Sequence, residues 1–439
     1  MSVARSETLT IDRRGFWDPE TFQLELKNIF QKSWLFVAHE SEIQHPGDYV
    51  TRRMGTEPVI VVRDERGDPH VFLNTCPHRG GQLCRAELGN TSHFRCGYHG
   101  WTFSNGGELR GVPQLRKVYP KDFDRRSHGL FAAVGVDTFA GLVFATFNPE
   151  APPLEEYLSD LGWYLQTYFG KAEMEVVGPP SRGILRSNWK VGAENYAGDG
   201  YHVRVSHQSP IELGIFGNND ALSELGPSAD RQLIYNIDAG NGHAVRVAKL
   251  PIEFEKPTFL GYPSELWDVF KERLAPDQLD AASGIAVTVG NAFPNLSFVD
   301  TVVSAERDAP LIAFMQLRQW QPLGPDRTEL LLWTLVPKDA PTEWKRKAHV
   351  GAIRTLGLGG IFEIDDLQNW SGMADVNRGD LAWRQEMVYE ASMPESPTRS
   401  SWPGLVYDVD PSEVSMLVLH RKWRELMGAH AVVAQKETP

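Results

Sequence analysis

Two short segments of this chain each pair one cysteine with one histidine, and this pairing restricts the fold more than any other feature. The first segment contains Cys76 and His78, and the second contains Cys96 and His99. Glycines border both pairs, which is typical of tight loops. The sequence has only three cysteines, an odd number that does not suit a disulfide framework. We therefore expect a fold that brings two loops together around a metal.

The mixed composition of each segment separates two kinds of metal site. A Rieske-type [2Fe-2S] cluster needs two thiolates on one iron and two imidazoles on the other, and two Cys/His loops supply them. A Cys2His2 zinc site uses the same ligand types, but it usually groups cysteine with cysteine and histidine with histidine. The pattern favours the cluster, with Cys76, His78, Cys96 and His99 as ligands, and leaves zinc as the alternative. Cys84 lies outside the pattern and is expected to be a small buried residue.

The region around these loops has the pattern of an all-β domain. Short β-type runs occur at 58–62, 70–73 and 141–147, with turn dipeptides such as Arg66-Gly67 between them.

We divide the chain into three parts. A helical stripe begins at Asp18, so residues 1–36 are expected to form a helical segment that packs with the larger domain. Residues 37–152 are expected to form the cluster domain, and residues 153–439 the larger domain.

The larger domain is expected to belong to the α+β class. The stretch that ends near Ala282 is polar and irregular in pattern. The order of elements predicts an antiparallel sheet with helices gathered to one side, a helix-grip arrangement. Strand-like runs lie at 311–317 and 329–336, and helical patterns lie at 154–165, 189–207, 342–356, 361–376 and 412–427.

The larger domain also contains a second candidate metal site. His202 and His207 lie about a turn and a half apart, so a helix that bends or ends between them can aim both imidazoles at one point. Two histidines and one carboxylate on an iron leave open positions for O2, as in non-haem Fe(II) oxygenases. Candidates for the carboxylate are Glu194, Asp199 and the acidic pair at 365–366, and the pattern alone does not choose among them.

The two metal patterns in one chain resemble a known family. The run Glu-Asn-Tyr-Ala-Gly-Asp at 194–199, the Phe-Pro-Asn segment at 293–295 and Phe-Glu-Ile-Asp-Asp-Leu-Gln-Asn-Trp at 362–370 carry the resemblance with the cysteine and histidine pairs. They resemble the large (α) subunit of Rieske non-haem iron aromatic ring-hydroxylating dioxygenases, the naphthalene, biphenyl and phenylpropionate group. The resemblance covers nearly the whole chain. It implies one [2Fe-2S] cluster and one mononuclear Fe(II).

The resemblance also implies the roles of individual residues. His202, His207 and Asp366 would bind the iron, whereas Asp365 would not. Asn195 would lie close to the iron without firm ligation.

Asp199 would connect the two metal centres. By resemblance it would bond His202 of its own subunit and the cluster ligand His99 of a neighbouring subunit, in a head-to-tail trimer. The assembly would be a homotrimer or α3β3, in which a small β subunit is a further partner.

The activity implied is the addition of both atoms of O2 to one face of an aromatic ring, giving a cis-dihydrodiol from a hydrocarbon or an aromatic carboxylate. The chain has no nicotinamide fingerprint, so electrons would come from an NAD(P)H-dependent reductase, directly or through a ferredoxin. Related enzymes monohydroxylate or demethylate with the same two centres, and this alternative stays open. A Rieske electron carrier without oxygenase activity is a remote alternative, since His202, His207 and Asp366 are all present.

One residue departs from the family pattern. Arg204 stands where the family usually has a small or apolar residue, and it is either a surface or interface arginine or a contact for an anionic substrate. The resemblance places Tyr196 near the pocket as a polar group. Apolar walls would come from Ile211, Leu213, Ile215 and Phe216.

Charge and hydropathy exclude several kinds of partner. A net charge of −13 argues against nucleic acid and anionic membranes, because both need a basic face. No apolar run reaches the roughly 18 residues of a membrane span. The segment from Met1 to Arg14 has no apolar core of the signal-peptide kind, so we expect a cytoplasmic protein.

Overall fold

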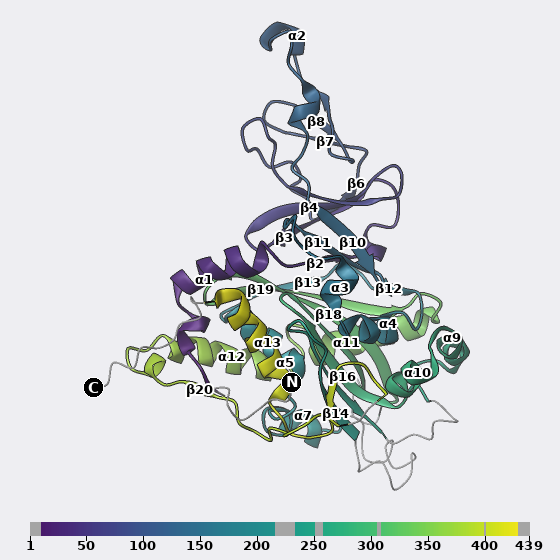
Figure 1. Cartoon of the computed structure of the whole chain (residues 1–439). Coiled ribbons are helices and arrows are strands. Elements are labelled where there is room, and N and C mark those ends of the chain that lie inside the picture. The colour runs from purple at the N-terminus through teal and green to yellow at the C-terminus, as the bar shows by residue number, and fades with distance from the viewer. Residues whose placement is uncertain (1–9, 216–232, 251–257, 305–308, 399–400, 429–439) are drawn as a thin grey trace. The chain divides into compact units, whose positions relative to one another are not determined.

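The computed structural model describes residues 10–215, 233–250, 258–304, 309–398 and 401–428 (Figure 1). The chain forms two compact units, one made of Phe30–Leu154 and the other of Met1–Ile29 together with Glu155–Pro439. The first boundary falls seven residues before the one we expected at 36, because the strand that begins at Leu35 already belongs to the smaller unit. The second boundary falls within two residues of the expected one.

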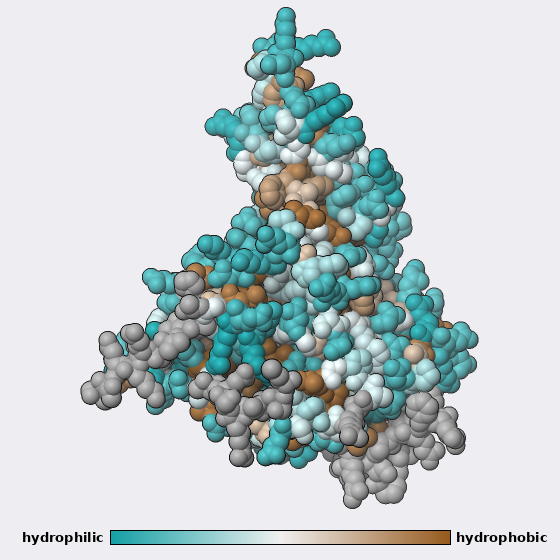
Figure 2. Space-filling model, viewed as in Figure 1, coloured by the Kyte–Doolittle hydropathy of each residue, from teal (hydrophilic) through white to brown (hydrophobic). Residues whose placement is uncertain are grey.

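The regular secondary structure of the smaller unit is almost entirely short antiparallel strands, as the sequence predicted. Its sheets run in the orders β5-β4-β3-β6, β10-β11-β2 and β7-β8-β9. Between β9 and β10 the structure describes one short α-helix, α2 (Leu115–Val118), and a 3-10 turn. Hydrophilic side chains dominate the face of this end of the unit that Figure 2 shows. The strands are β2 (Leu35–His39), β3 (Asp48–Met54), β4 (Glu57–Arg63), β5 (Pro69–Leu73), β6 (Leu88–Asn90), β7 (His93–Arg95), β8 (Thr102–Ser104), β9 (Leu109–Gly111), β10 (Gly135–Phe139) and β11 (Leu142–Thr146).

The strand β4 forms the centre of this unit because its apolar run is buried on both faces. The four residues from Val59 to Val62 are all fully buried. A two-residue loop joins β3 to β4, and Gly55 in that loop has a φ of 59°, which glycine adopts without a steric penalty. Ile60 and Val62 pack in the same core cluster as Cys76 and Cys96, so the core of the unit lies directly beneath the two loops.

The larger unit is built on a nine-stranded sheet, and every pair of neighbouring strands in it is antiparallel. The order is β12-β19-β18-β17-β16-β15-β14-β21, with β13 also paired to β19. The expected α+β class and antiparallel sheet are confirmed. The strands are β12 (Met174–Val176), β13 (Ser181–Leu185), β14 (Leu233–Asp238), β15 (Ala244–Lys249), β16 (Ile285–Ala292), β17 (Leu296–Ser304), β18 (Leu311–Gly324), β19 (Arg327–Pro337) and β21 (Leu405–Tyr407), and a separate pair joins β1 (Thr10–Ile11) to β20 (Met387–Val388).

The reading of the stretch before Ala282 as irregular was wrong for β14 and β15. All six residues of β15 are buried, although Arg246 and Lys249 are charged. These two cations form ion pairs with Asp410 and Asp280, so they can lie inside the sheet without an uncompensated charge. The polar composition therefore concealed a central strand.

Helices cover both faces of this sheet, whereas the sequence suggested one side. On one face, Phe314 of β18 packs with Ala348 and Ala352 of α11. On the other face, Phe169 of α4 contacts Phe298 of β17. Phe298 is paired across the strands with Leu317, which lies three residues after Phe314 on β18 and therefore points to the opposite face. The helices of the unit are α1 (Pro19–Glu25), α3 (Leu154–Leu158), α4 (Leu161–Phe169), α5 (Trp189–Gly198), α6 (Val203–Ser206), α7 (Gln208–Glu212), α9 (Trp267–Arg273), α10 (Pro276–Ala282), α11 (Thr342–Leu356), α12 (Glu363–Asn377) and α13 (Val414–Met427), and the π-helical turn Leu26–Phe30 continues α1.

A buried carboxylate ties the N-terminal helix to this unit. Asp18 caps α1 by accepting the backbone N–H of Thr21 at 2.8 Å. At the other end of the helix, the carboxylate of Glu25 accepts bonds from the indoles of Trp189 (3.0 Å) and Trp423 (2.7 Å) and pairs with Lys190.

Candidate metal centres

The two Cys/His loops of the smaller unit have the same backbone design. In the first, the N–H of Cys76 donates to the carbonyl of Gly81, and the N–H of Gly80 donates to the carbonyl of Cys76. The second repeats both bonds from Cys96, with Trp101 and Gly100 as partners. The fifth residue of each loop is therefore a glycine, with φ of 70° and 74°. The histidines differ by one position within loops of equal length, which explains the unequal Cys-x-His and Cys-x2-His spacing.

The loops bring the four expected cluster ligands together. The rings of His78 and His99 lie 4.5 Å apart. Burial raises the pKa of the Cys76 thiol, and the neighbouring Cys96 thiol raises it further, while backbone N–H groups of the first loop oppose both effects by stabilising the thiolate. The Nδ1 atom of His78 is buried and has no hydrogen-bond partner in the described part of the chain.

These features fit a cluster held between the loops. A side chain on Gly81 would place a Cβ atom 3.1 Å from the Cys96 sulfur, so glycine keeps this space free. The His78 ring is stacked on Trp101 at 4.8 Å, and its Nε2 atom lies 3.4 Å from the Tyr119 hydroxyl. Cys84 is buried outside the loops as expected, and burial raises the pKa of its thiol to about 12.

The second centre lies where the long helix that we expected over 189–207 is broken. Helix α5 ends at Gly198, whose Cβ atom would lie 2.9 Å from Ser415, so the chain leaves the helix through a residue without a side chain. Asp199 then accepts the N–H of Tyr201 at 3.0 Å. The four-residue helix α6 follows, and His202 and His207 flank it at its two ends.

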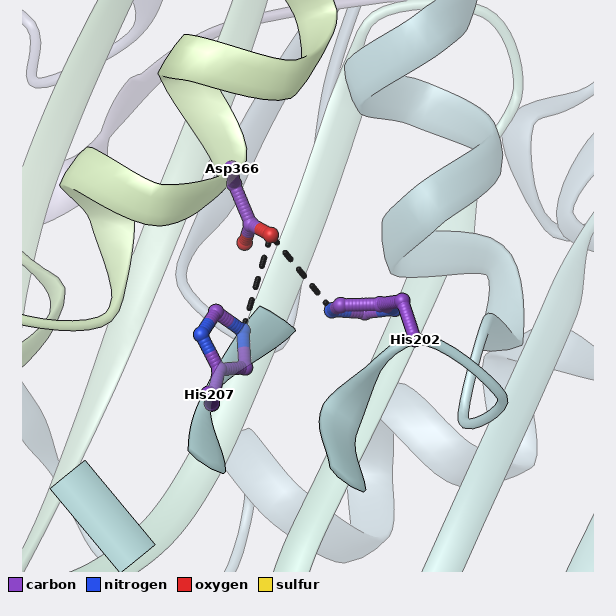
Figure 3. A group of neighbouring side chains, drawn as sticks. All are labelled: His202, His207 and Asp366. Carbon is purple, nitrogen blue, oxygen red and sulfur yellow. Dashed lines mark ion pairs between the residues drawn. The ribbon is translucent and has the colours of Figure 1, made fainter. Parts of the chain in front are cut away.

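Both imidazoles point at one carboxylate (Figure 3). The Nε2 atoms of His202 and His207 each lie 3.5 Å from the same Oδ1 atom of Asp366. One ligand atom from each of the three residues lies within 4.8 Å of the others, a spacing that suits a single metal ion. Asp366 stands in the first turn of α12 and is 5% exposed. Two imidazoles and one buried carboxylate are a donor set of the kind that binds non-haem iron.

Each imidazole also has its own carboxylate partner at Nδ1, the ring nitrogen that faces away from Asp366. Asp199 lies 3.2 Å from Nδ1 of His202, and Asp365 lies 3.4 Å from Nδ1 of His207. Burial disfavours charge on both Asp199 and His202, but their mutual hydrogen bond and opposite charges lower the pKa of Asp199 and raise the pKa of His202. Asn195 lies 3.5 Å from the same nitrogen of His202. Such outer partners fix the orientation of metal-binding imidazoles.

The structure narrows the choice of carboxylate that the sequence left open. Glu194 turns away from the histidine pair, because its Oε2 atom lies 2.5 Å from His420 and accepts a bond from Tyr389 at 3.0 Å. Asp365 acquires a contact that sequence reasoning did not foresee. Its position beside Asp366 gave no signal, because only the tertiary contact between α12 and His207 reveals it.

The residues expected near the substrate pocket occupy different environments. Arg204 is exposed on α6. Tyr196 is buried, with the Arg318 guanidinium 4.2 Å from its ring centre. Ile211 and Leu213 are 39% and 49% exposed. Ile215 is half-buried, and Phe216 lies outside the described residues.

Comparisons with known proteins match both parts of the chain. The profile of the Rieske [2Fe-2S] domain matches residues 33–130, and that of the ring-hydroxylating alpha subunit (catalytic domain) matches residues 154–429. In the described residues, no helix combines the length and apolarity needed to span a bilayer.

Characterised relatives cover nearly the whole chain. The N,N-dimethyl phenylurea N-demethylase subunit alpha of Sphingobium sp. (strain YBL2) is 31% identical over 93% of this chain and 89% of that protein. The large oxygenase component of the naphthalene 1,2-dioxygenase system of Pseudomonas putida is 35% identical over 80% of this chain and 76% of that protein. The crystal structure of naphthalene 1,2-dioxygenase from Rhodococcus sp. bound to indole has a TM-score of 0.89 and 37% identity, covering 95% of this chain and 94% of that one.

Proposed function

Because this chain belongs to the ring-hydroxylating alpha subunits that carry a Rieske [2Fe-2S] domain, we propose that it is the terminal oxygenase component of a system that cis-dihydroxylates an aromatic ring. It is an oxidoreductase with one Rieske cluster and one mononuclear iron. Cys76, His78, Cys96 and His99 would hold the cluster. His202, His207 and Asp366 would hold the iron.

The observation that carries the proposal is the carboxylate pairing of the two imidazoles. When bound, the cluster passes single electrons and the mononuclear iron activates O2. Asp199 and Asp365 hold the Nδ1 atoms of His202 and His207, so both Nε2 atoms stay directed at Asp366. Three protein donors leave further positions open, which oxygenation requires.

The reaction needs an external source of electrons. An arene, O2, two electrons and two protons give a cis-dihydrodiol with both oxygen atoms on one ring. The partners would be an aromatic substrate, O2 and an NAD(P)H-dependent reductase, acting directly or through a ferredoxin. We place the protein in the cytoplasm, because none of its three cysteines forms a disulfide bond, which suits a reducing compartment.

We further propose a head-to-tail trimer, alone or with a small β subunit. Residues 30–154 carry 14 basic and 13 acidic side chains, whereas the remainder carries 30 basic and 44 acidic ones. The smaller unit of one copy can therefore approach the acidic larger unit of another without repulsion. In that arrangement Asp199 would bond His99 of the neighbouring subunit. A mass in solution three times 49.3 kDa would support the trimer, and a monomer with both metals bound would contradict it.

Demethylation is the second candidate, because the relative from Sphingobium is an N-demethylase subunit. A dimethylated amine, O2, two electrons and two protons would then give the monomethyl amine, formaldehyde and water. The fate of the oxygen atoms separates the two candidates. Dihydroxylation places both atoms of O2 in the diol, whereas demethylation divides them between formaldehyde and water.

The test is a single turnover under 18O2. Protein with about three irons and two sulfides per chain would be reduced without air, then mixed with naphthalene or an N,N-dimethyl phenylurea. A diol with two 18O atoms supports dihydroxylation, whereas formaldehyde without a diol supports demethylation. Turnover of neither compound by protein with both metals would contradict both candidates for these substrates.

A further inference from the structure

A fully buried arginine joins the elements that meet at the iron site. Arg318 lies on β18 and is 0% exposed. Its guanidinium donates to Glu363 at 2.8 Å, to the side chain of Gln316 at 3.1 Å and to the backbone carbonyl of Leu356 at 3.1 Å. Leu356 is the last residue of α11, and Glu363 is the first residue of α12. One side chain therefore connects a central strand with the end of one helix and the start of the next.

The contact with Glu363 acts on the helix that presents the iron-binding carboxylate. Glu363 is 0% exposed and stands three residues before Asp366, about one helical turn away. Because both residues belong to the first turn of α12, a fixed Glu363 side chain limits how far this turn, and with it the backbone of Asp366, can shift.

The same guanidinium also contacts α5, the helix that precedes the two histidines in the chain. Its central carbon lies 4.2 Å from the centre of the Tyr196 ring, a distance typical of a cation–π contact. Tyr196 belongs to α5 and follows Asn195, which lies 3.5 Å from His202. Arg318 thus contacts a residue close to each part of the proposed iron site, Tyr196 and Glu363, although these two residues are 167 positions apart in the sequence.

Stability is a weak explanation for this ion pair. A pair in which both side chains are 0% exposed loses all hydration, and replacing such a pair by apolar residues is often neutral or stabilising. The placement of the pair is therefore the feature that needs explanation. From it we propose that Arg318 and Glu363 are positioning residues that hold Asp366 in register with His202 and His207. The inference rests on the iron site proposed above.

The test measures Fe(II) affinity in anaerobic protein that retains its cluster but lacks the mononuclear iron. The double variant Arg318→Met/Glu363→Met removes both charges, so its folding does not depend on an unpaired buried ion. We expect it to keep its cluster spectrum and to bind Fe(II) about 10-fold more weakly, the lower end of the effect of losing an outer partner of a metal ligand, because the pair acts on Asp366 through α12 and not by a direct bond. Arg318→Lys, which keeps the charge but lacks the planar fork, should fall between the double variant and the original protein.

The matched control is a second buried ion pair, between Lys171 and Asp300, with 2% and 3% side-chain exposure. Among the described residues this pair also contacts Tyr262 and Phe270, neither of which belongs to α5 or α12. We expect Lys171→Met/Asp300→Leu to leave Fe(II) affinity unchanged. Equal losses from both double variants, or unchanged affinity in Arg318→Met/Glu363→Met, would overturn the inference.

The same titration separates this inference from the proposed function. If the original protein does not bind one Fe(II), or if His202→Ala binds it equally well, the proposed iron site fails and the positioning role fails with it. If His202→Ala abolishes binding while Arg318→Met/Glu363→Met binds normally, only the positioning role is wrong.

Discussion

The adjacent acids Asp365 and Asp366 give the sharpest test of the iron site, because the structure assigns them opposite orientations. Asp366 faces both Nε2 atoms, so Asp366→Ala should lose the mononuclear iron. Among the described residues, the Asp365 carboxylate bonds Nδ1 of His207, at 3.4 Å, and no other side chain. Loss of an outer partner of this kind lowers metal affinity about 10- to 100-fold, or roughly 1.4–2.7 kcal/mol. The Asp365 side chain is 33% exposed, against 6% for Asp366. Because solvent screens the exposed Asp365 carboxylate, we expect Asp365→Asn to lower the Fe(II) affinity by about 10-fold, the lower end of that range.

The assay is calorimetric titration of Fe(II) into anaerobic protein that has lost only its mononuclear iron. The visible spectrum of the cluster serves as an internal measure of protein concentration, since the cluster lies in the other unit and these substitutions should not change it. Asp375→Asn on the same helix is the control, because Asp375 is half exposed and pairs with Arg186 and Arg378 instead of a histidine. A greater loss of affinity in Asp365→Asn than in Asp366→Ala would show that the assignment of the ligand is reversed. Unchanged affinity in Asp365→Asn would refute its role as a partner of His207.

Three further perturbations have defined outcomes. Asp199→Asn keeps an acceptor for the backbone turn at Tyr201 but loses the negative charge beside His202. With both metals bound, turnover should fall about 10- to 100-fold. Steady-state kinetics near the original rate would contradict the electron-transfer role of Asp199. Cys96→Ser should abolish the visible absorption of the cluster, whereas an unchanged spectrum would mean that this thiol is not a ligand. Burial lowers the pKa of His243 to about 4, from an ordinary value of 6.5. Below pH 6.5 the unfolded chain therefore binds a proton that the folded chain does not. The larger unit should have its full stability above pH 6.5 and lose about 3 kcal/mol of unfolding free energy as the pH falls to 4. In urea titrations across this range His243→Gln should flatten that dependence, and a parallel slope would assign the loss to other groups.

Local sequence was sufficient for the elements whose signals lie close together in the chain. The helix predicted at 342–356 has the same bounds in the structure, because its apolar and polar positions repeat with the helical period. The four residues proposed as cluster ligands could be named from the sequence because each loop encodes its own Cys/His pair and its own glycine. The pair His202 and His207 could be proposed for the same reason, because both lie in one short segment.

Sequence reasoning failed where charge is neutralised by a distant partner. The strand β15 was missed because Arg246 and Lys249 indicate a surface, and their acidic partners at 410 and 280 cannot be known before the fold. We expected the helix at 189–207 to bend or end between His202 and His207, but it already ends at Gly198. That position was missed, since it depends on close packing of Gly198 against Ser415.

The sequence by itself determined which kinds of metal this protein can hold, because the ligand types and their local spacing are properties of short segments. Only the tertiary structure decided how the ligands are oriented. It turned Asp366 toward the histidine pair, turned Asp365 to the far side of His207, and placed the Arg318–Glu363 pair behind them. The physical reason is that orientation depends on contacts between segments far apart in the chain, whose energies exist only once the sheet and its helices are packed.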